Sequence, residues 1–259
     1  MPDTVLHTVS GASLPGVQYF CTTRQGGVST GPWASLNLGL HTDDDIAHVQ
    51  SNRQRLQAML PGAPVWLNQV HGTEVFDADV LPSQELNWPA VVPTADAVIT
   101  SQLDRPLIIM TADCLPIVLV SSDGCALGLA HAGWRGLAAG VLENTLEALK
   151  RKTDSAVSWY AWIGPSISQP CFEVGDDVLG VFTDTDAQAA RYFIRGKLPG
   201  KWQADLPGLA YRRLLQAGVG TIERSGLCTY TDSQQFFSYR RTPVTGRLAT
   251  VAWLTAFCG

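Results

Sequence analysis

The sequence predicts an α+β fold in which mixed β-sheets lie between helices, and three observations support this class. Apolar residues make up 46% of the 259 positions and charged residues only 16%, which suits a large core with buried sheets. Strand-like and helix-like segments alternate irregularly, and several strands are joined by hairpins rather than by crossover helices. The chain contains no repeat, low-complexity tract or linker, so one domain spanning residues 1–259 is expected.

Four segments have the pattern of helices. The first, residues 42–62, begins with acidic side chains, repeats apolar residues at Ile46, Val49, Leu56 and Leu60, and stops at a Pro-Gly pair. The other predicted helices are residues 135–152, 172–182 and 206–220, the last with Gly218 near its C-terminal cap.

Short apolar or alternating segments predict the strands. They are residues 16–29, a strand entering a glycine turn near Gly26 and Gly27; 63–75, a strand, turn and strand around His71-Gly72; 95–120, two strands with Pro116 interrupting the second; 126–134; 158–168; and a final pair at 228–241 and 245–257.

The bulk properties exclude several classes of protein. The net charge of −5 argues against nonspecific nucleic-acid binding, which needs a basic surface. No run of 18 apolar residues predicts a membrane span, and the start of the chain lacks the pattern of a secretory signal. The six cysteines, at positions 21, 114, 125, 171, 228 and 258, have no regular spacing and are expected to be reduced thiols. We therefore expect a cytoplasmic protein without a membrane or nucleic-acid partner.

Cys114 and His131 lie at matched distances on either side of a predicted hairpin turn in "SSDG", residues 121–124. A two-residue turn would place Cys114 opposite Gly133 with His131 diagonal to it, and a four-residue turn would place Cys114 opposite His131. Both registers put the two side chains on one face of the sheet, because side chains alternate with a period of two. A three-residue loop would separate them. Taken singly, each residue also has an ordinary structural interpretation in a core.

His71 is the best third member of such a site, because "WLNQVHGTEV" places it beside a glycine at a strand end, where loops gather. The alternative is a turn histidine with only local hydrogen bonds. The remaining histidines have simpler interpretations: His48 on a solvated helix face, His7 near the terminus, and His41 as a capping or rim residue.

One thiolate and two imidazoles are a ligand set for Zn²⁺, and three protein ligands leave a fourth position open, as in catalytic sites. Cys125 shares the correct face but lies roughly 20 Å along the strand from His131, and Asp113 points to the other face, so neither completes a closed structural site. A blue-copper site is disfavoured because Met110 lies roughly 13 Å along the strand from Cys114.

Two arginines are candidate contacts for an anionic substrate. Arg135 follows closely after His131 at the start of a predicted helix, where free backbone N–H groups and two glycines can hold an anion such as phosphate. Arg24 in "TTRQGG" is the second candidate. Both can also be surface residues, since glycines before helices are common.

The motifs "TTRQGGVS", "SLNLG", "LNQVHG", "ADAVIT", "TADCLPIVL", "AHAGWRGLAAGVLE", "IGPSISQPCFEVGDDV" and "CTYTDSQQFFSYRR…TGRLATVAWL" closely resemble those of the YfiH-like proteins, a family known as laccase-domain, polyphenol oxidase or purine nucleoside phosphorylase proteins. The resemblance extends from about residue 15 to the C-terminus. It implies two mixed sheets between helices, a cysteine-hydrolase-type fold, and a metal site of His71, Cys114 and His131.

The activity implied by this resemblance is phosphorolysis of adenosine, inosine and S-methyl-5′-thioadenosine, giving free base and (methylthio)ribose 1-phosphate, with adenosine deamination as a side activity. The implied cofactor is Zn²⁺, with Cu²⁺ as the alternative metal, and the implied partners are small-molecule nucleosides and phosphate. The same three side chains would be catalytic, while Arg24 and Arg135 would bind substrate. Asp113 and Glu173 are candidates for protonating the departing purine.

Three other functions stay open at this point. A four-copper laccase is implausible because the chain has only five histidines and no His-x-His pair, although copper at the same three ligands could oxidise phenols weakly. A cysteine hydrolase or amidase could use Cys114 as nucleophile and His131 as its base. A non-catalytic protein could use the metal only for folding, and a chelator would then unfold it.

Overall fold

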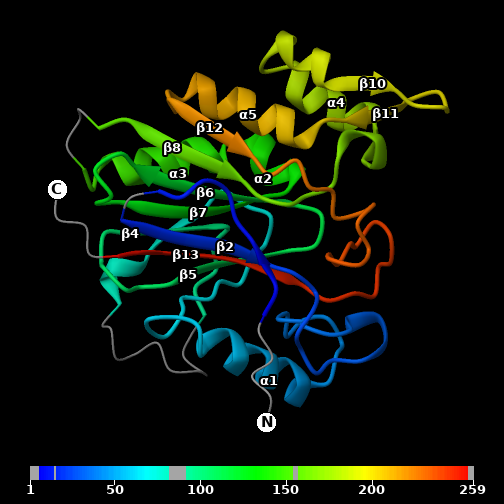
Figure 1. Ribbon diagram of the computed structural model, residues 1–259. Coiled ribbons are helices and arrows are strands. Elements are labelled where there is room, and N and C mark those ends of the chain that lie inside the picture. The colour runs from blue at the N-terminus through cyan, green and yellow to red at the C-terminus, as the bar shows by residue number, and fades with distance from the viewer. Residues whose placement is uncertain (1–5, 15, 82–91, 154–156, 256–259) are drawn as a thin grey trace.

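Two β-sheets stacked face to face form the centre of the molecule, and helices cover the outer face of each sheet (Figure 1). The computed structural model describes residues 6–14, 16–81, 92–153 and 157–255. Among these residues, one sheet consists of antiparallel strands in the order β1 (Thr8–Val9), β2 (Val17–Thr22), β13 (Leu248–Leu254) and β5 (Leu107–Thr111).

The second sheet is mixed, as the sequence predicts. Its strands follow the order β12 (Thr221–Arg224), β8 (Trp159–Ile163), β6 (Leu115–Ser121), β7 (Leu127–Ala132), β4 (Ala97–Thr100) and β3 (Val75–Asp77). The two outermost pairs, β12 with β8 and β3 with β4, are parallel, and the inner pairs are antiparallel. A small third sheet contains β10 (Phe193–Arg195), β11 (Lys201–Ala204) and β9 (Glu173–Gly175).

The described helices are α1 (Ile46–Gln57), α2 (Trp134–Ala139), α3 (Val141–Lys150), α4 (Asp176–Thr183) and α5 (Leu206–Gln216). Short 3₁₀ turns occur at η1 (Gly31–Trp33), η2 (Ala78–Val80), η3 (Gln169–Cys171) and η4 (Ala187–Tyr192). None of the helices within the described ranges is long and apolar enough to span a bilayer.

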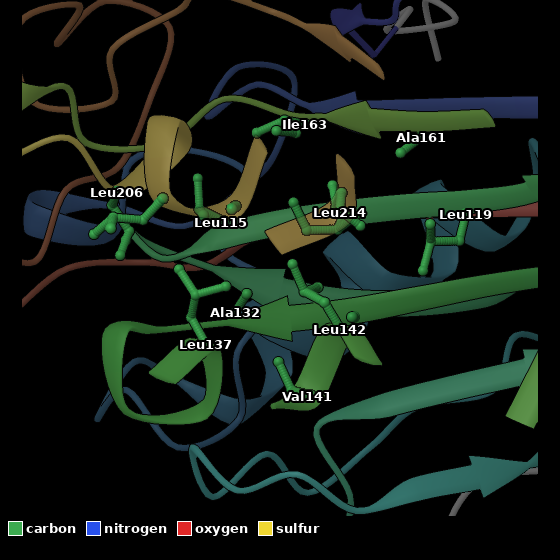
Figure 2. Close-up of a cluster of buried hydrophobic side chains, with 14 of the residues drawn as sticks. Leu115, Leu119, Ala132, Leu137, Val141, Leu142, Ala161, Ile163, Leu206 and Leu214 are labelled. Carbon is green, nitrogen blue, oxygen red and sulfur yellow. The ribbon is translucent and has the colours of Figure 1, made fainter. Parts of the chain in front are cut away.

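Three apolar clusters hold these layers together. Figure 2 shows part of the first, in which Leu142 and Leu214 from the helices pack toward strand residues such as Leu115 and Ala132. The second cluster fills the space between the two large sheets, and the third lies between the four-stranded sheet and α1. Strand β5 serves two clusters, because Ile109 points toward the other sheet and Ile108 toward α1, as the period-two alternation requires.

The predicted helices at 42–62 and 206–220 are confirmed with shorter bounds. The helix predicted at 172–182 is confirmed only from Asp176 onward, as α4 ending at Thr183, because Glu173–Gly175 form strand β9 against β11. Asp45 caps α1 by accepting a 2.8 Å hydrogen bond from the Ala47 N–H, and Val49 and Leu56 are buried on its inner face. Ile46, which was expected on the same face, is 61% exposed in the first turn. Gly218 adopts φ +92° just after α5, as a C-terminal cap does.

The predicted continuous helix at 135–152 is wrong, because the chain forms two helices there. Gly140 adopts a left-handed conformation with φ +102° and ends α2, and α3 begins at the next residue. Helical periodicity continues across this break because the buried faces of both helices contact the same sheet. Glycine tolerates the left-handed conformation without the steric penalty of a side chain.

Several strand predictions are also corrected. Residues 63–71 form only isolated bridges, at Val65 and Asn68, so the first strand expected in 63–75 is absent. Residues 95–120 contain three strands rather than two, and Pro116 lies inside β6 without interrupting it, because the pairing of β6 with β8 begins only at Ile117.

The final strand pair is wrong as well. Residues 228–241 form no strand, and β13 pairs instead with β2 and β5, so its partners come from the first half of the chain. Residues 256 and 257 of the predicted strand at 245–257, together with Cys258, lie outside the described residues. The five described cysteines are free thiols.

Candidate metal centre

The β6–β7 hairpin brings Cys114 and His131 to one face, as predicted. Leu115 pairs with Ala132 and Pro116 with His131, which is the register that places Cys114 opposite Gly133. The sequence predicted this register for a two-residue turn, but the loop that joins the strands has four residues. The Ser121 N–H closes this loop by donating to the Ala126 carbonyl at 3.0 Å. Cys114 itself lies in the bend just before β6.

His71 completes a compact cluster with these two residues. The ligand atoms of His71, Cys114 and His131 all lie within 4.8 Å of one another. The Cys114 Sγ is 4.0 Å from His71 Nε2, and the two imidazole rings are in an edge-to-face arrangement with centroids 4.8 Å apart. His131 is buried, Cys114 half-buried and His71 exposed, so the cluster opens to solvent on the His71 side.

Asp96 organises two of the three candidate ligands, and it is not among the site residues predicted from the sequence. Its fully buried carboxylate lies 2.8 Å from His131 Nδ1 and accepts backbone N–H bonds from Val70 at 3.1 Å, His71 at 2.9 Å and Gly72 at 2.6 Å. These bonds hold the turn in which His71 adopts a positive φ of 62°. The only signal in the sequence was an aspartate inside the otherwise apolar segment "ADAVIT".

Glycine allows the elements of the site to come close together. A Cβ atom on Gly133 would lie 2.9 Å from His71 Cδ2 and 3.1 Å from Cys114 Sγ. A Cβ on Gly136 would lie 2.7 Å from the Gly72 carbonyl oxygen, so α2 packs directly on the turn that carries His71. Side chains at these two positions would displace the cluster.

Charge interactions within the cluster shift the pKa of both buried ligands. Burial raises the pKa of the Cys114 thiol, but His131 and His71 outweigh burial and lower it to about 6. Burial lowers the pKa of His131, and the Cys114 thiolate and Asp96 raise it to about 9. The metal-free site therefore favours a thiolate beside an imidazolium at neutral pH.

The donor set fits a metal ion. Asp96 engages Nδ1 of His131, which leaves Nε2 as its ligand atom, and this second-sphere carboxylate is a common feature of metal-binding histidines. The thiolate sulfur and two imidazole nitrogens match the preferences of Zn²⁺. Within the described residues, no other group of histidine, cysteine and acidic side chains converges in this way.

A cavity of about 460 Å³ opens beside the cluster, within the range of small-molecule sites. Its wall includes Arg135, Arg240 and Arg247 together with His41. His41, predicted as a capping or rim residue, lies in this wall. Arg240 and Arg247 are not among the predicted site residues, because they reach the cavity from distant parts of the chain. Burial and the neighbouring Arg247 and Arg53 lower the pKa of His41.

The two predicted substrate-binding arginines are placed differently. Arg135 is exposed at the cavity wall, with its guanidinium 4.5 Å from the centroid of the Trp134 ring. Arg24 is not among the cavity-lining residues, and it donates to the carbonyls of Ala34 at 2.8 Å and Ser233 at 3.0 Å. The sequence predicts an anion site at the N-terminus of a long helix that begins near Arg135. The structure has only the six-residue helix α2 there, which offers less support for such a site.

The two candidate acids also have structural roles. Asp113 lines the cavity, but its carboxylate accepts hydrogen bonds from Thr229 Oγ1 at 2.7 Å, Ser238 Oγ at 3.0 Å and the Arg240 N–H at 2.7 Å. Glu173 is exposed and does not line the cavity, although its carbonyl accepts a 2.7 Å bond from Arg240. Both residues position Arg240 in the structure.

Comparison with known proteins finds matches over nearly the whole chain. A family model described as multi-copper polyphenol oxidoreductase laccase matches residues 18–255. The purine nucleoside phosphorylase of Xylella fastidiosa is 46% identical over 248 residues, which cover 93% of each chain. The Escherichia coli protein named purine nucleoside phosphorylase YfiH is 43% identical over 241 residues, covering 92% of this chain and 94% of its own.

Solved structures show the same architecture. Neisseria meningitidis protein NMB0706 matches with a TM-score of 0.87 at 39% identity, covering 97% of this chain and 99% of that one. YlmD from Geobacillus stearothermophilus matches with a TM-score of 0.85 at 32% identity, covering 99% and 94%. The mixed α/β architecture with several sheets is therefore common to these proteins.

Proposed function

This chain belongs to the multi-copper polyphenol oxidoreductase laccase family of YfiH-like proteins, and from that premise we propose that it is a metal-dependent purine nucleoside phosphorylase. The observation that carries the proposal is the His71–Cys114–His131 cluster opening into a cavity with three arginines on its wall. The proposed substrates are phosphate with adenosine, inosine or S-methyl-5′-thioadenosine. The names of the curated relatives support the reaction class.

In this reaction a phosphate oxygen forms a bond to C1′ of the ribose while the bond from C1′ to the purine nitrogen breaks. The electron pair of the broken bond goes to the purine, which leaves as the free base after taking up a proton, and ribose 1-phosphate remains. Positive charge develops on the sugar and negative charge on the base, so groups that stabilise either charge accelerate the step.

The arginines of the cavity wall are the proposed phosphate contacts. Arg135 is retained from the sequence prediction, and Arg240 and Arg247 join it because they line the same cavity. Guanidinium groups bind phosphate oxygens in a bidentate way and stay charged throughout the physiological pH range. Arg24 is proposed to support this wall indirectly, because its contacts hold the segment at Ser233 and Gln235 that leads to Arg240.

His71, Cys114 and His131 are the proposed ligands of Zn²⁺, with Cu²⁺ as the alternative. When bound, Zn²⁺ supplies a Lewis acid and lowers the pKa of water toward neutrality. Asp96 fixes the ring of His131 by its bond to Nδ1, and Gly133 leaves room for the other two ligands. The proposed deaminase side activity replaces the exocyclic amine at C6 of adenosine with oxygen from water and releases ammonia.

The decisive experiment incubates the purified, zinc-loaded protein with adenosine, with and without phosphate, and separates the products by chromatography. We expect adenine and ribose 1-phosphate only when phosphate is present, and no products with C114A. Inosine formed without phosphate would indicate deamination alone. Absence of both products in protein with one equivalent of zinc would refute the nucleoside proposal.

The role of the arginines is tested separately by the KM for phosphate. R240M and R247M should raise this KM at least tenfold with a smaller change in the KM for adenosine, because one charge-assisted contact contributes about 1.5–3 kcal/mol. R151M is the matched control, since Arg151 is exposed, pairs with Glu147 at 3.1 Å and does not line the cavity. An unchanged phosphate KM in both variants would place phosphate elsewhere.

A second candidate function is that of a cysteine hydrolase, and one observation favours it. Asp96, His131 and Cys114 form a carboxylate–imidazole–thiol series, and the pKa of Cys114 is lowered to about 6. This function requires activity on an amide substrate in chelator-treated protein and its loss on alkylation of Cys114. Activity that instead returns only with added metal supports the phosphorylase proposal.

We also propose a cellular setting, a domain organisation and a class of partners. The five described free thiols suit a reducing compartment, so we place the protein in the cytoplasm. The family model matches residues 18–255, which supports the proposal of a single catalytic domain over residues 1–259. The proposed partners are small molecules and not nucleic acid, in keeping with the net charge of −5.

A further inference from the structure

Cys171 and Cys228 are brought together away from the metal cluster. Cys171 ends the short turn η3, and Cys228 lies in the segment after β12. The Cys228 Sγ accepts hydrogen bonds from Ser168 Oγ at 3.0 Å and from the Ser168 N–H at 3.4 Å. The Cys171 N–H donates to the Ser168 carbonyl at 3.0 Å, so both cysteines bond to Ser168.

The pKa values of the two thiols shift in opposite directions. Burial raises the pKa of Cys228, but hydrogen bonds from Ser168 and Thr231 lower it to about 7, while burial raises the pKa of Cys171. A neighbouring pair with one thiolate and one thiol has the arrangement of a peroxide-sensitive site, in which the thiolate reacts first and the thiol resolves. Both residues are half-buried, so a small oxidant has access.

We propose that Cys171 and Cys228 form a reversible disulfide when the protein meets hydrogen peroxide. The Cys228 thiolate attacks one peroxide oxygen, the O–O bond breaks, and protonation of the departing hydroxide gives water and a sulfenic acid on Cys228. The Cys171 sulfur then attacks the sulfenic sulfur, and a second water leaves as the S–S bond forms. Two thiols are oxidised by two electrons and one peroxide is reduced to two waters.

The disulfide would join two segments that support the cavity. Ser166 forms a β-bridge with Cys228, and the Ile167 N–H donates to the Asp113 carbonyl at 3.0 Å. Thr229, the neighbour of Cys228, donates to the Asp113 carboxylate at 2.7 Å. Oxidation is therefore expected to reduce local opening on the Asp113 side of the cavity, because a covalent link restricts separation of segments that now hold together by hydrogen bonds.

The test is mass spectrometry of the zinc-loaded full-length protein after treatment with one to a few equivalents of hydrogen peroxide. Free thiols are blocked with N-ethylmaleimide, and the protein is digested without reductant. We expect a cross-linked pair of peptides containing Cys171 and Cys228, two mass units lighter than the two reduced peptides, and its disappearance on adding a thiol reductant.

Substitutions separate this site from the other cysteines. C171S and C228S should abolish the cross-link, whereas C125S should leave it unchanged. S168A should slow its formation several-fold, because the Cys228 thiolate loses its Oγ donor. The proposal fails if Cys171 and Cys228 are recovered as separate alkylated thiols while Cys114 or Cys125 is oxidised, or if Cys228 is converted to a sulfinic acid without the link.

Hydrogen–deuterium exchange tests the connection to the cavity without relying on catalysis. Peptides that contain residues 166–172 should exchange more slowly in the oxidised than in the reduced protein, and peptides from α1 should not change. Equal exchange of residues 166–172 in the two forms would refute the coupling. None of these readouts depends on the proposed phosphorylase activity, so failure of one proposal is distinguishable from failure of the other.

Discussion

Asp96 and Asp113 are two buried aspartates beside the same cluster, and their surroundings differ in kind. Asp96 contacts two of the clustered residues directly. Its carboxylate bonds to the ring of His131 and to the backbone of the turn that carries His71. Asp113 precedes Cys114, and its carboxylate accepts hydrogen bonds from Thr229, Ser238 and the backbone N–H of Arg240. One carboxylate sets the charge and orientation of ligands, and the other fixes the loop that forms the opposite cavity wall.

The difference shows that burial and hydrogen bonding alone do not identify a residue that acts on the chemistry. Both carboxylates are satisfied by several donors, but only Asp96 has a titratable ligand as one of them. Changes around Asp96 should therefore alter metal binding, while changes around Asp113 should alter the placement of substrate. Four predictions test this division, beginning with a change to the cluster itself.

The largest effect is expected from G133A. The new Cβ would lie 2.9 Å from His71 Cδ2 and 3.1 Å from Cys114 Sγ, so the ligands must separate. We expect zinc affinity to fall at least about 100-fold and phosphorolysis to approach background, since altered supporting contacts alone reduce metal affinity by about 10–100-fold. Zinc titration with a competing chelator and the adenosine assay measure both effects.

The matched control for G133A is G180A on α4, where an added Cβ would meet no atom within 4 Å. It should keep wild-type zinc affinity and increase stability by about 0.5–1 kcal/mol, because alanine restricts the unfolded chain in a helical position. Full zinc binding by G133A would show that the cluster tolerates more movement than its packing suggests.

The second prediction concerns D96N, which should weaken zinc binding by about 10–100-fold. The amide no longer supplies a charged acceptor to His131 Nδ1, and its NH₂ group would face backbone N–H donors at one of the two carboxylate positions. Activity should recover in part at high zinc concentration. Circular dichroism and thermal unfolding confirm that the variant is folded, and unchanged zinc affinity would contradict the assignment of Asp96.

The third prediction concerns D113N, which should leave zinc affinity within about threefold of wild type and lower kcat/KM roughly tenfold through misplacement of the cavity wall. The hydroxyl groups of Thr229 and Ser238 can rotate to accommodate an amide, but the Arg240 N–H cannot. Parallel zinc titration and steady-state kinetics check the prediction. If D113N loses zinc as severely as D96N, the two aspartates do not have separate roles.

The smallest effect on activity is expected from D79N, which provides a structural reference far from the cluster. Burial raises the pKa of Asp79, but hydrogen bonds from Lys152, Ser101 and Thr100 lower it to about 2. Its stabilisation is therefore complete above the unfolded pKa of about 4 and disappears as the pH falls from about 4 to about 2.

For D79N we expect unchanged activity and a loss of about 2 kcal/mol of unfolding free energy at pH 7, which shrinks toward pH 2. Urea unfolding of both proteins between pH 2 and pH 7 measures this difference. A stability difference that stays constant over that range would mean that the charge of Asp79 does not contribute.

Local features of the sequence determined the elements that depend on neighbouring residues. The Asp45 cap and apolar spacing define α1, and Gly218 ends α5. The period-two alternation placed Cys114 and His131 on one face for a loop with an even number of residues, and the observed register has such a loop. The motifs then indicated His71 as the third ligand through the family resemblance.

Tertiary structure alone decided the features that join distant segments. Asp96 reaches the His71 turn and the His131 ring at once, and Arg240 and Arg247 reach the cavity from the segment between β12 and β13, which contains no strand. Arg24 lies away from the cavity although its motif resembles a site, because its guanidinium is taken by backbone carbonyls. Such contacts depend on how the sheets pack, and hydrophobic periodicity describes only which face of an element is buried, not which element covers it.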